Sequence, residues 1–445
     1  MAERGPSRRD FLGTAAAGLA VGAAARPASA ASANRVIGAN DRINVGFIGV
    51  GGRGRGHVRR VYARSQEQAD VHVVAVCDIY SKRKEAAREM AKLAPKELHH
   101  EYAEVLARED VDAVYISSPD HWHGPMTLAA LDAGKDVYLE KPMTYTLHEA
   151  QEVAKRVRAH KRVLQIGSQH LSDQRYHRAR EVIQKGWIGQ PLWTQNTYSR
   201  NSLHGEWNYT IDDEGTPENI DWNLFVGPAP DREFNADRYF RWRKYWDYSG
   251  GVATDLFYHR LAPLEFAIGM GFPTRVTANG GIYVHKDREV PDTYSTNIEY
   301  EDHYALMSAS MASAAANQWM PPVIYGHEGT IQFVPGGIAI LPEHQFRKKF
   351  EAAAGAPELL IPVERQSIDD DHTTNFLDCV RSRKDPVFDA DMGYQVMTAI
   401  DLGVQSYRQN RVMAFDPRRE LVLDEAPARA AYEGSGKNYE EPPRR

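Results

Sequence analysis

A glycine-rich turn between a predicted strand and a predicted helix constrains the fold of this chain more than any other feature. Residues 43–49 form an apolar, β-rich run, and Gly49, Gly51 and Gly54 follow with the spacing G-x-G-x-x-G. The first glycine allows a tight turn, the second lets a pyrophosphate approach the backbone, and the third lets the helix pack closely on the strand. The helix expected from there to about Arg64 would present its N-terminus to the phosphates. The turn therefore predicts a dinucleotide-binding fold.

An acidic residue follows the next apolar run, where a dinucleotide fold needs one. Residues 71–77 predict a second strand that ends at Asp78, 24 residues after Gly54. A carboxylate there can accept hydrogen bonds from the adenosine ribose hydroxyls, and it would repel a 2′-phosphate. The expected cofactor is therefore NAD. NADP stays possible, because three residues that can bind a phosphate follow closely, namely Ser81, Lys82 and Arg83.

Alternating strands and helices continue up to residue 168. The pattern predicts strands at 111–117, 137–140 and 162–167 and helices at 125–133 and 147–160. Such alternation indicates a parallel sheet with right-handed crossovers and helices on both faces. Ligands bind at the carboxyl ends of parallel strands, and three segments follow such ends: 117–123, 140–143 and 168–170. Residues 42–168 are thus expected to form an α/β Rossmann domain.

Residues 169–418 follow a different pattern. Runs of alternating polar and apolar residues predict strands at 275–285, 293–300, 304–311 and 329–334. Helices are expected at 374–382 and 393–409, a turn at 335–337 and a polar insertion at 346–360. Strands that follow one another closely favour antiparallel pairing. This part is therefore predicted to be an α+β domain with a large, open, mostly antiparallel sheet, followed by a polar tail over residues 419–445.

The first thirty residues are typical of an export signal. Arg8 and Arg9 open a short charged region, a run of mostly Ala and Gly covers residues 13–25, and an A-x-A site follows at 28–30. Together these parts resemble a twin-arginine signal peptide over residues 1–30, although a disordered basic N-terminus stays open. The run is too short and too weakly apolar to anchor the chain in a bilayer. The mature protein, with a linker or arm at residues 31–41, is expected in the periplasm or secreted, without a membrane segment.

Composition excludes several classes of function. The chain of 445 residues is 42% hydrophobic and 26% charged, which is typical of a soluble globular protein. The net charge of −6 and the lack of a long basic block argue against nucleic acid as a partner. Two cysteines, Cys77 and Cys379, provide neither a disulfide scaffold nor a Cys-rich zinc site. His121 and His123 lie two residues apart without a nearby carboxylate or thiolate set, so no metal site is expected.

One pair of residues has the spacing of a catalytic acid–base group. Asp255 and His259 follow Gly250-Gly251 and are four residues apart, which places them on one face of a helix. A histidine beside a carboxylate is a tunable general base near neutral pH. Lys141, at the end of a predicted strand, could stabilise a developing alkoxide in the same cleft. The alternative interpretation is a helix cap at Asp255 and a partly buried histidine.

These motifs together resemble one enzyme family. G-x-G-x-x-G at residues 49–54, Asp78, Glu140-Lys141-Pro142 and Asp255-x-x-x-His259 are similar to the Gfo/Idh/MocA family (glucose–fructose oxidoreductase, inositol dehydrogenase) over about residues 42–410. The resemblance implies a Rossmann domain, and an open sheet whose far face supports a homo-oligomer, a dimer or a tetramer. It also implies that Lys141, Asp255 and His259 are catalytic and that the Lys141–Pro142 peptide is cis.

The candidate site residues fall into two sets. Those expected to bind the cofactor are Gly49, Val50, Gly51, Arg53, Gly54, Asp78, Ser118, Pro119, His123, Glu140, Lys141 and Gln169. Those expected to contact the substrate are Lys141, Trp242, Arg243, Asp255 and His259. Six of the eight tryptophans lie between residues 187 and 246. Aromatic faces stack on the apolar faces of sugar rings, so a small-molecule carbohydrate is the expected partner, although packing explains any single tryptophan equally well.

The resemblance and the export signal together predict an NAD(P)-dependent oxidoreductase that acts on a secondary alcohol of a sugar, polyol or glycoside. Outside the cytoplasm no nicotinamide pool is available, so the cofactor is expected to stay tightly bound and to be recycled in place. One alternative is a redox-neutral, NAD-dependent, glycoside-cleaving enzyme of the same fold, although such relatives typically carry a different segment at residues 140–142. A second alternative is a non-catalytic sugar-binding protein.

Overall fold

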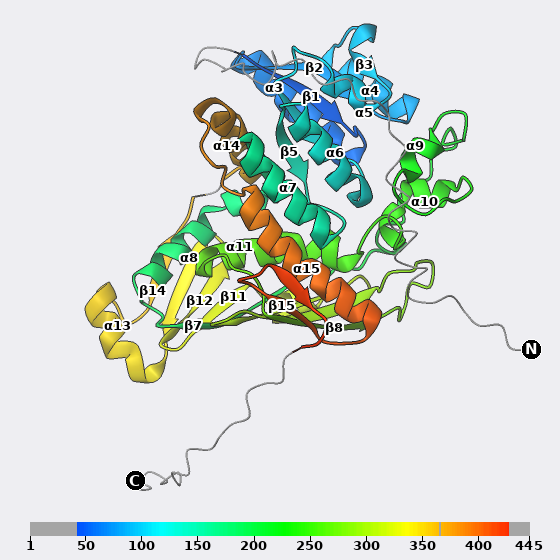
Figure 1. The fold of residues 1–445 in the computed structure, drawn as a ribbon. Coiled ribbons are helices and arrows are strands. Elements are labelled where there is room, and N and C mark those ends of the chain that lie inside the picture. Colours follow the sequence, from blue (N-terminus) through cyan, green and yellow to red (C-terminus); the bar gives the residue numbers. More distant parts are fainter. Residues whose placement is uncertain (1–41, 365, 427–445) are drawn as a thin grey trace, which may run out of the picture.

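Two sheets organise the part of the chain that the computed structural model describes, residues 42–364 and 366–426 (Figure 1). The first sheet has the order β3-β2-β1-β4-β5-β6, and all of its neighbouring strands are parallel. Its strands are β1 (Ile43–Ile48), β2 (Val71–Cys77), β3 (Leu98–His99), β4 (Ala113–Ile116), β5 (Asp136–Glu140) and β6 (Leu164–Gly167). Strands β1, β2, β4 and β5 are nearly continuous apolar runs, as expected where both faces of a parallel sheet are covered.

Helices cover both faces of this first sheet. They are α3 (Gly52–Glu67), α4 (Ser81–Ala91), α5 (Tyr102–Leu106), α6 (Asp120–Asp132) and α7 (Leu147–His160). A helix from much later in the chain, α14 (Ile368–Ser382), joins them, because its Phe376 and Leu377 pack with Val45 and Phe47 of β1 in one apolar cluster. The expected Rossmann domain is confirmed.

The second sheet is larger and mostly antiparallel, which confirms the second half of the predicted fold class. Its order is β14-β13-β12-β11-β7-β10-β9-β8-β15-β16, and only β7 and β10 pair in parallel. The strands are β7 (Pro191–Thr197), β8 (Arg275–Gly281), β9 (Thr293–Glu299), β10 (Tyr304–Ser310), β11 (Val323–Gly326), β12 (Gly329–Val334), β13 (Gly337–Pro342), β14 (Leu359–Pro362), β15 (Met413–Asp416) and β16 (Leu421–Leu423).

Three helices lie between the two sheets in Figure 1: α8 (Gln174–Gln184), α11 (Tyr258–Ile268) and α15 (Ala390–Gln409). The largest apolar cluster runs without a break from Ile48 and Leu139 in the first sheet, through Leu261 and Ile400 in the helices, to Met307 in the second. Shorter helices are α9 (Trp222–Val226), α10 (Ala236–Phe240), α12 (Ala316–Trp319) and α13 (Arg347–Ala354), with single 3-10 turns at Pro95–Glu97, Gln169–Ser172, Trp242–Lys244 and His344–Phe346. Because this core is continuous, it holds the two domains in a fixed arrangement, and with them the residues of any site that lies between the sheets.

Several boundaries differ from the sequence-based expectations. Helix α6 begins at Asp120 rather than at residue 125, because burial of its first turn outweighs the proline within it. Strand β8 ends at Gly281, because the Asp292 carboxylate accepts hydrogen bonds from the three amides of residues 283–285 and turns the chain away. The expected polar insertion at 346–360 forms α13 and the start of β14. The expected tail begins with a strand, β16.

A long connection in the second domain reaches back to the first. Within this bridging segment (residues 201–248), Ile220 forms an isolated antiparallel bridge with Tyr80, which follows β2. The amide of Ser81 donates to the carbonyl of Asn219 at 3.3 Å, and that of Asp221 donates to the carbonyl of Ile79 at 3.2 Å. The bridging segment therefore covers the edge of the Rossmann domain where the adenosine half of a dinucleotide is expected.

None of the helices in residues 42–364 and 366–426 combines the length and hydropathy needed to cross a bilayer. The predicted export signal and the 31–41 arm lie outside these residues.

Candidate active site

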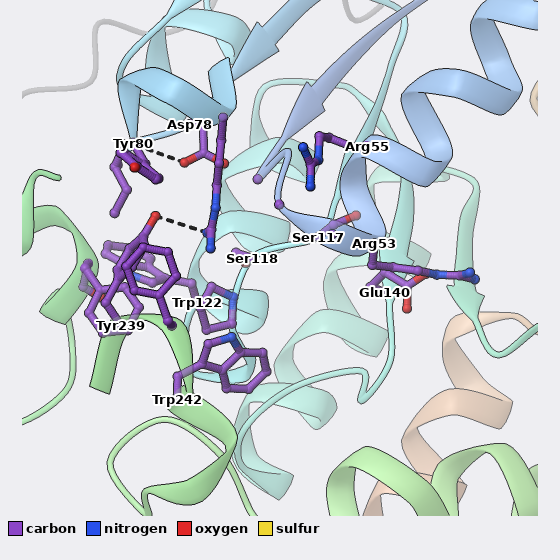
Figure 2. A pocket seen from close by; sticks show the side chains of 18 of the residues that line it. Arg53, Arg55, Asp78, Tyr80, Ser117, Ser118, Trp122, Glu140, Tyr239 and Trp242 are labelled. Atoms are coloured by element: carbon purple, nitrogen blue, oxygen red, sulfur yellow. Dashed lines mark hydrogen bonds and ion pairs between the residues drawn. The ribbon is translucent and has the colours of Figure 1, made fainter. Parts of the chain in front are cut away.

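A cavity of about 970 Å³ lies between the Rossmann domain, the bridging segment and the start of α11. Figure 2 shows Asp78 and Tyr80 at one end and Glu140 and Arg53 at the other, with the aromatic rings of Tyr239, Trp122 and Trp242 nearby. The cavity is also lined by Gly49, Gly51, Ser118, Pro119, Lys141, Gln169, Arg243, Asp255 and His259. Most residues predicted from the sequence therefore meet in one place.

The glycine turn has the shape that a pyrophosphate requires. Gly49 has a φ of +79°, and a Cβ there would lie 2.9 Å from the backbone of Ser117. A Cβ on Gly54 would lie 2.0 Å from the carbonyl oxygen of Gly49, whereas one on Gly52 would meet nothing within 4 Å. Helix α3 starts without a side-chain cap and without an acidic residue in its first turn. Its free amides and positive dipole end fit an anion, so these residues fit the pyrophosphate of NAD.

Asp78 lies at the carboxyl end of β2, as predicted. Its carboxylate accepts hydrogen bonds from the amide of Val50 at 2.8 Å and from that of Tyr80 at 2.9 Å. These bonds hold both carboxylate oxygens in place, and each oxygen keeps a lone pair for a ribose hydroxyl. The two cations next to it are already engaged. Lys82 pairs with Asp212 at 3.0 Å and Glu214 at 2.8 Å, and Arg83 donates to the Tyr239 hydroxyl at 3.1 Å.

Glu140 organises the far end of the cavity. Its Oε1 accepts hydrogen bonds from Arg53 and from the His57 ring, both at 2.7 Å. Although burial alone would raise the pKa of Glu140, Arg53 and His57 hold it well below the usual range. Arg53 also donates to Asp369 at 3.3 Å, so its guanidinium is bonded within this ion-pair network. Arg53 and Arg55 both line the cavity. The predicted cis peptide between Lys141 and Pro142 is confirmed.

Three of the residues predicted to bind cofactor do not line the cavity: Val50, Gly54 and His123. Val50 and Gly54 shape the turn from within. The ring of His123 is buried between the carbonyls of Ser118 at 2.9 Å and Pro142 at 2.6 Å. Burial lowers the pKa of His123 to about 4, although the two carbonyls oppose the shift, and a neutral ring donates its single N–H to only one of them. His123 therefore ties two cavity-lining loops together.

Lys141 and Asp255 form the centre of the site. The Lys141 ammonium donates to Asp255 Oδ1 at 2.6 Å and to the carbonyl of the same residue at 2.7 Å. Arg243 Nε also donates to Oδ1 at 2.9 Å, and Trp207 Nε1 donates to Oδ2 at 3.0 Å. Burial opposes charge on Asp255, but Lys141 and Arg243 outweigh it and hold the pKa of the carboxyl far below its usual range. The carboxylate is thus a fixed anion that positions two cations.

Asp255 does not orient His259 in the way that their spacing predicts. Residues Ala253–Phe257 form one π-helical turn, which changes the register between the two side chains. No hydrogen bond joins them in the described structure; His259 Nδ1 instead has a long contact of 3.4 Å with Ser168 Oγ. Burial, Lys141 and the neighbouring His170 keep the pKa of His259 well below its usual range. The imidazole is therefore neutral and able to accept a proton.

A buried carboxyl, Asp120, is a site residue that the sequence analysis missed. It lines the cavity at the start of α6, and its Oδ2 accepts hydrogen bonds from Ser249 Oγ at 2.9 Å and Thr254 Oγ1 at 3.1 Å. Burial raises the pKa of Asp120 to about 7, although Arg243 and Lys141 oppose the shift. Its place directly after Ser118-Pro119, at the end of a parallel strand, was the available signal.

This raised pKa predicts a pH-dependent effect of Asp120→Asn on stability. A carboxyl whose pKa is raised by folding destabilises the folded protein as pH rises from its unfolded pKa toward its folded pKa, here from about 4 to about 7. The amide has no charge to bury, so the variant is expected to gain about 2–4 kcal/mol over wild type at pH 8, and little of this at pH 4. Calorimetry at both pH values measures the gain, and an equal difference at both would contradict the assignment.

The bridging segment supplies most of the other missed residues: Arg200 just before it, and Trp207, Tyr209 and Tyr239 within it. The cluster of tryptophans and tyrosines in this stretch was the only signal in the sequence. Of the residues predicted there, Trp242 and Arg243 both line the cavity. The guanidinium of Arg243 stacks on the Trp242 ring, 4.1 Å from its centre.

Neither the histidine pair nor the cysteines add a second chemistry. His121 bonds through Nε2 to the carbonyl of Phe225 at 2.8 Å. Within residues 42–364 and 366–426, no three His, Cys, Asp or Glu side chains are placed to hold a metal ion. Cys77 and Cys379 are both buried and free, and burial raises the pKa of each thiol.

Two family models match the chain. One describes the Gfo/Idh/MocA oxidoreductase family with an NAD-binding Rossmann fold and matches residues 43–168. The other describes the C-terminal alpha/beta domain of the same oxidoreductase family and matches residues 173–330. The two matched ranges together cover more than half of the chain.

Individual relatives and solved structures agree with these matches. The inositol 2-dehydrogenase of Salmonella typhimurium is 26% identical over 311 residues, which are 62% of this chain and 89% of the relative. That of Klebsiella pneumoniae subsp. pneumoniae is 34% identical over 171 residues, 38% of this chain and 49% of the relative. The solved structure of levoglucosan dehydrogenase in complex with NADH and levoglucosan has a TM-score of 0.64 at 16% identity, over 84% of this chain and 98% of that chain. At such low identity the structural likeness supports the fold alone.

Proposed function

Because the chain belongs to the Gfo/Idh/MocA family of NAD-binding oxidoreductases, we propose that it oxidises a secondary alcohol of a sugar, polyol or glycoside with a tightly held NAD. One observation carries this proposal: Lys141, Asp255 and His259 line the same cavity as the glycine turn. The names of the inositol dehydrogenases support a ring-shaped, hydroxyl-rich substrate.

The residues of the site divide the work of an alcohol oxidation. When bound, NAD accepts the hydride from the carbon that bears the reacting hydroxyl. His259 Nε2, which has no hydrogen bond within the described structure, takes the hydroxyl proton, because the imidazole is neutral. Lys141 has a third ammonium hydrogen beyond the two bonded to Asp255, and it donates this hydrogen to the developing alkoxide. Asp255 fixes the ammonium in place, and Gln169 lines the cavity nearby.

Product analysis tests the proposed function. Incubation of the holoprotein with a panel of sugars, polyols and glycosides should yield a ketone product, together with reduced cofactor absorbing near 340 nm. A free monosaccharide or aglycone without net oxidation would instead indicate redox-neutral cleavage of a glycoside. Binding without any chemistry would indicate the sugar-binding alternative.

Export and cofactor retention belong to the same proposal. The twin-arginine pattern of residues 1–30 supports a periplasmic or secreted enzyme, loaded with NAD before it crosses the membrane. The bridging segment supports retention: Tyr239 is buried, its hydroxyl accepts from Arg83, and that guanidinium lies 4.9 Å from the Tyr239 ring centre. A Cβ added to Gly51 would meet Arg83 at 3.4 Å. These contacts place the bridging segment beside the dinucleotide turn.

Mature protein is therefore expected to elute from gel filtration with near-stoichiometric NAD. Tyr239→Ala should increase the loss of cofactor, because it removes the ring that packs on Arg83; the exposed Tyr283→Ala is the matched control. Deletion of residues 31–41 tests the predicted arm separately. The cofactor released on denaturation is quantified by absorbance and mass spectrometry. A folded apoenzyme that works only with added NAD would refute tight retention.

The proposal includes a homo-oligomer that uses the outer face of the second sheet. Trp193 stacks between Tyr304 at 5.6 Å and Tyr325 at 4.0 Å, so three rings form a ladder across neighbouring strands. Tyr304 is 40% exposed in the single chain. Replacing Tyr304 with Asp is expected to shift the protein toward monomer in sedimentation velocity. A wild-type protein that is monomeric at micromolar concentration would contradict this part of the proposal.

A further inference from the structure

The substrate end of the cavity holds more positive than negative side chains. Lys141, Arg200 and Arg243 all line the cavity. The carboxylates that contact them are Asp255, which bonds both Lys141 and Arg243, and Glu206, which lies near Arg200. Asp120 also lines the cavity, but burial raises its pKa to about 7, so near neutral pH three cations face two fixed carboxylates and one that is only partly ionised.

Arg243 uses only part of its hydrogen-bonding capacity. Its Nε donates to Asp255 Oδ1 at 2.9 Å, and its guanidinium carbon lies over the Trp242 ring, 4.1 Å from the ring centre. Neither of its two terminal nitrogens has a hydrogen-bond partner within residues 42–364 and 366–426. A guanidinium held by an aromatic ring and by one carboxylate presents its remaining donors to a ligand in a fixed fork.

Arg200 extends the same positive surface. Its guanidinium lies 4.5 Å from the Tyr198 ring centre, and its only ion pair in the described structure is the 3.5 Å contact with Glu206. A second guanidinium, that of Arg260, lies 4.2 Å from the same ring, and among the residues that the structure describes its buried Nε has no hydrogen-bond partner. Burial opposes charge on Arg200, yet Tyr198 first, and then Asp255 and Glu206, hold its pKa above the ordinary value. Arg200 and Arg243 line the same cavity.

Unpaired guanidinium groups in a partly buried cavity are costly unless a ligand satisfies them. Both arginines keep free donors of the kind that pair with a planar anion through two parallel hydrogen bonds. We propose that the substrate is an anionic sugar, a sugar acid whose carboxylate is bound by Arg200 and Arg243 while its secondary hydroxyl faces Lys141 and His259. This inference rests on the proposed function and specifies its substrate class.

A carboxylate fits this surface better than a phosphate. The two anions share the chemistry that guanidinium groups recognise, but a phosphate monoester carries close to two negative charges at neutral pH. Three cations against two fixed carboxylates leave at most one net positive charge, which a monoanion balances and a dianion would exceed. Sugar phosphates are therefore expected to bind more weakly than sugar acids of the same ring.

The test measures five ligands on the holoprotein. Glucose is compared with its acid, glucuronate, and with glucose 6-phosphate, and galactose is compared with its acid, galacturonate. Calorimetric titration measures binding, and absorbance near 340 nm measures reduction of the bound cofactor. At least one acid of the two pairs should bind tenfold or more tightly than its neutral parent, and added salt should weaken it. Arg200→Gln should cost that acid about tenfold in affinity, which is the loss of one charged hydrogen bond, and it should cost the neutral parent markedly less than the acid. Arg178→Gln, on the exposed face of α8, is the matched control.

The outcomes separate this inference from the proposed function. If the acids bind no more tightly than their neutral parents, or if Arg200→Gln affects both equally, the anionic-sugar proposal is overturned, while oxidation of the neutral sugars would leave the proposed function standing. If glucose 6-phosphate binds more tightly than the acids, the carboxylate assignment is wrong. If an acid binds through Arg200 but no sugar reduces the cofactor, the anion site stands and the proposed oxidation fails.

Discussion

His259→Ala is expected to lower turnover by about 10²–10⁴-fold while NAD stays bound, because the variant lacks the group proposed to take the hydroxyl proton. His259 lines the cavity, and its pKa lies well below the usual range through burial and through the nearby charge of Lys141. A neutral base is ready to act at any pH above that low pKa. As pH falls, the wild-type kcat/KM is therefore expected to show no titration step near pH 6.5, where a free histidine becomes protonated.

Single-turnover reduction of the bound cofactor, followed at several pH values, measures this effect without the recycling step. His344→Ala is the matched control, because His344 lies in an exposed turn before α13 and should leave the rate unchanged. Released cofactor is quantified in parallel, so that loss of NAD is not mistaken for loss of the base. Near-normal turnover in His259→Ala would remove this residue from the mechanism.

Asp255→Ala is expected to destabilise the folded protein by about 3–5 kcal/mol, because it leaves two buried cations without their partner. The carboxylate accepts hydrogen bonds from Lys141, Arg243 and Trp207, and the Lys141 side chain is only 10% exposed. Because folding lowers the pKa of Asp255, its stabilising effect is present above the unfolded pKa of about 4 and declines as pH falls below it. The difference between variant and wild type should therefore narrow in acid.

Urea unfolding of the holoprotein at pH 7 and at about pH 3, below the unfolded pKa, measures the change. Asp391→Ala removes an aspartate from an exposed pair with Arg158, in which both side chains are more than half exposed, and should cost less than about 1 kcal/mol. Asp255→Asn retains the shape of the side chain without its charge, and an intermediate loss is expected. If Asp255→Ala unfolds at the same urea concentration as wild type, the cluster is not the buried ion-pair centre described above.

Local patterns were enough to predict the Rossmann half of the molecule. The G-x-G-x-x-G turn, the continuous apolar runs and Asp78 each depend on contacts between residues that are close in sequence or in neighbouring strands. The same holds for helix α7, which starts at Leu147 and ends at His160 as predicted, because Thr146 and Glu149 form a capping box. Lys141 was placed correctly at a strand end for the same reason.

The substrate side depended on tertiary structure, because its parts come from distant segments. Nothing local to residues 253–259 shows the π-helical turn, which separates His259 from Asp255 and brings it near Ser168. Asp120 acquires its raised pKa only when Ser249 and Thr254 close over it. The bridging segment reaches the nucleotide domain through backbone hydrogen bonds and side-chain pairs between residues far apart in the chain, which no periodicity signals.

The sequence by itself therefore determined the fold class, the dinucleotide turn and the set of candidate site residues, since these follow from periodicity, glycine geometry and residue chemistry. Only the tertiary structure decided which side chains pair, which are neutral and which keep free donors. Burial and neighbouring charge set those properties, and both depend on groups such as Lys141, Arg243 and Trp207 that are separated by up to about a hundred residues in the chain and meet at Asp255.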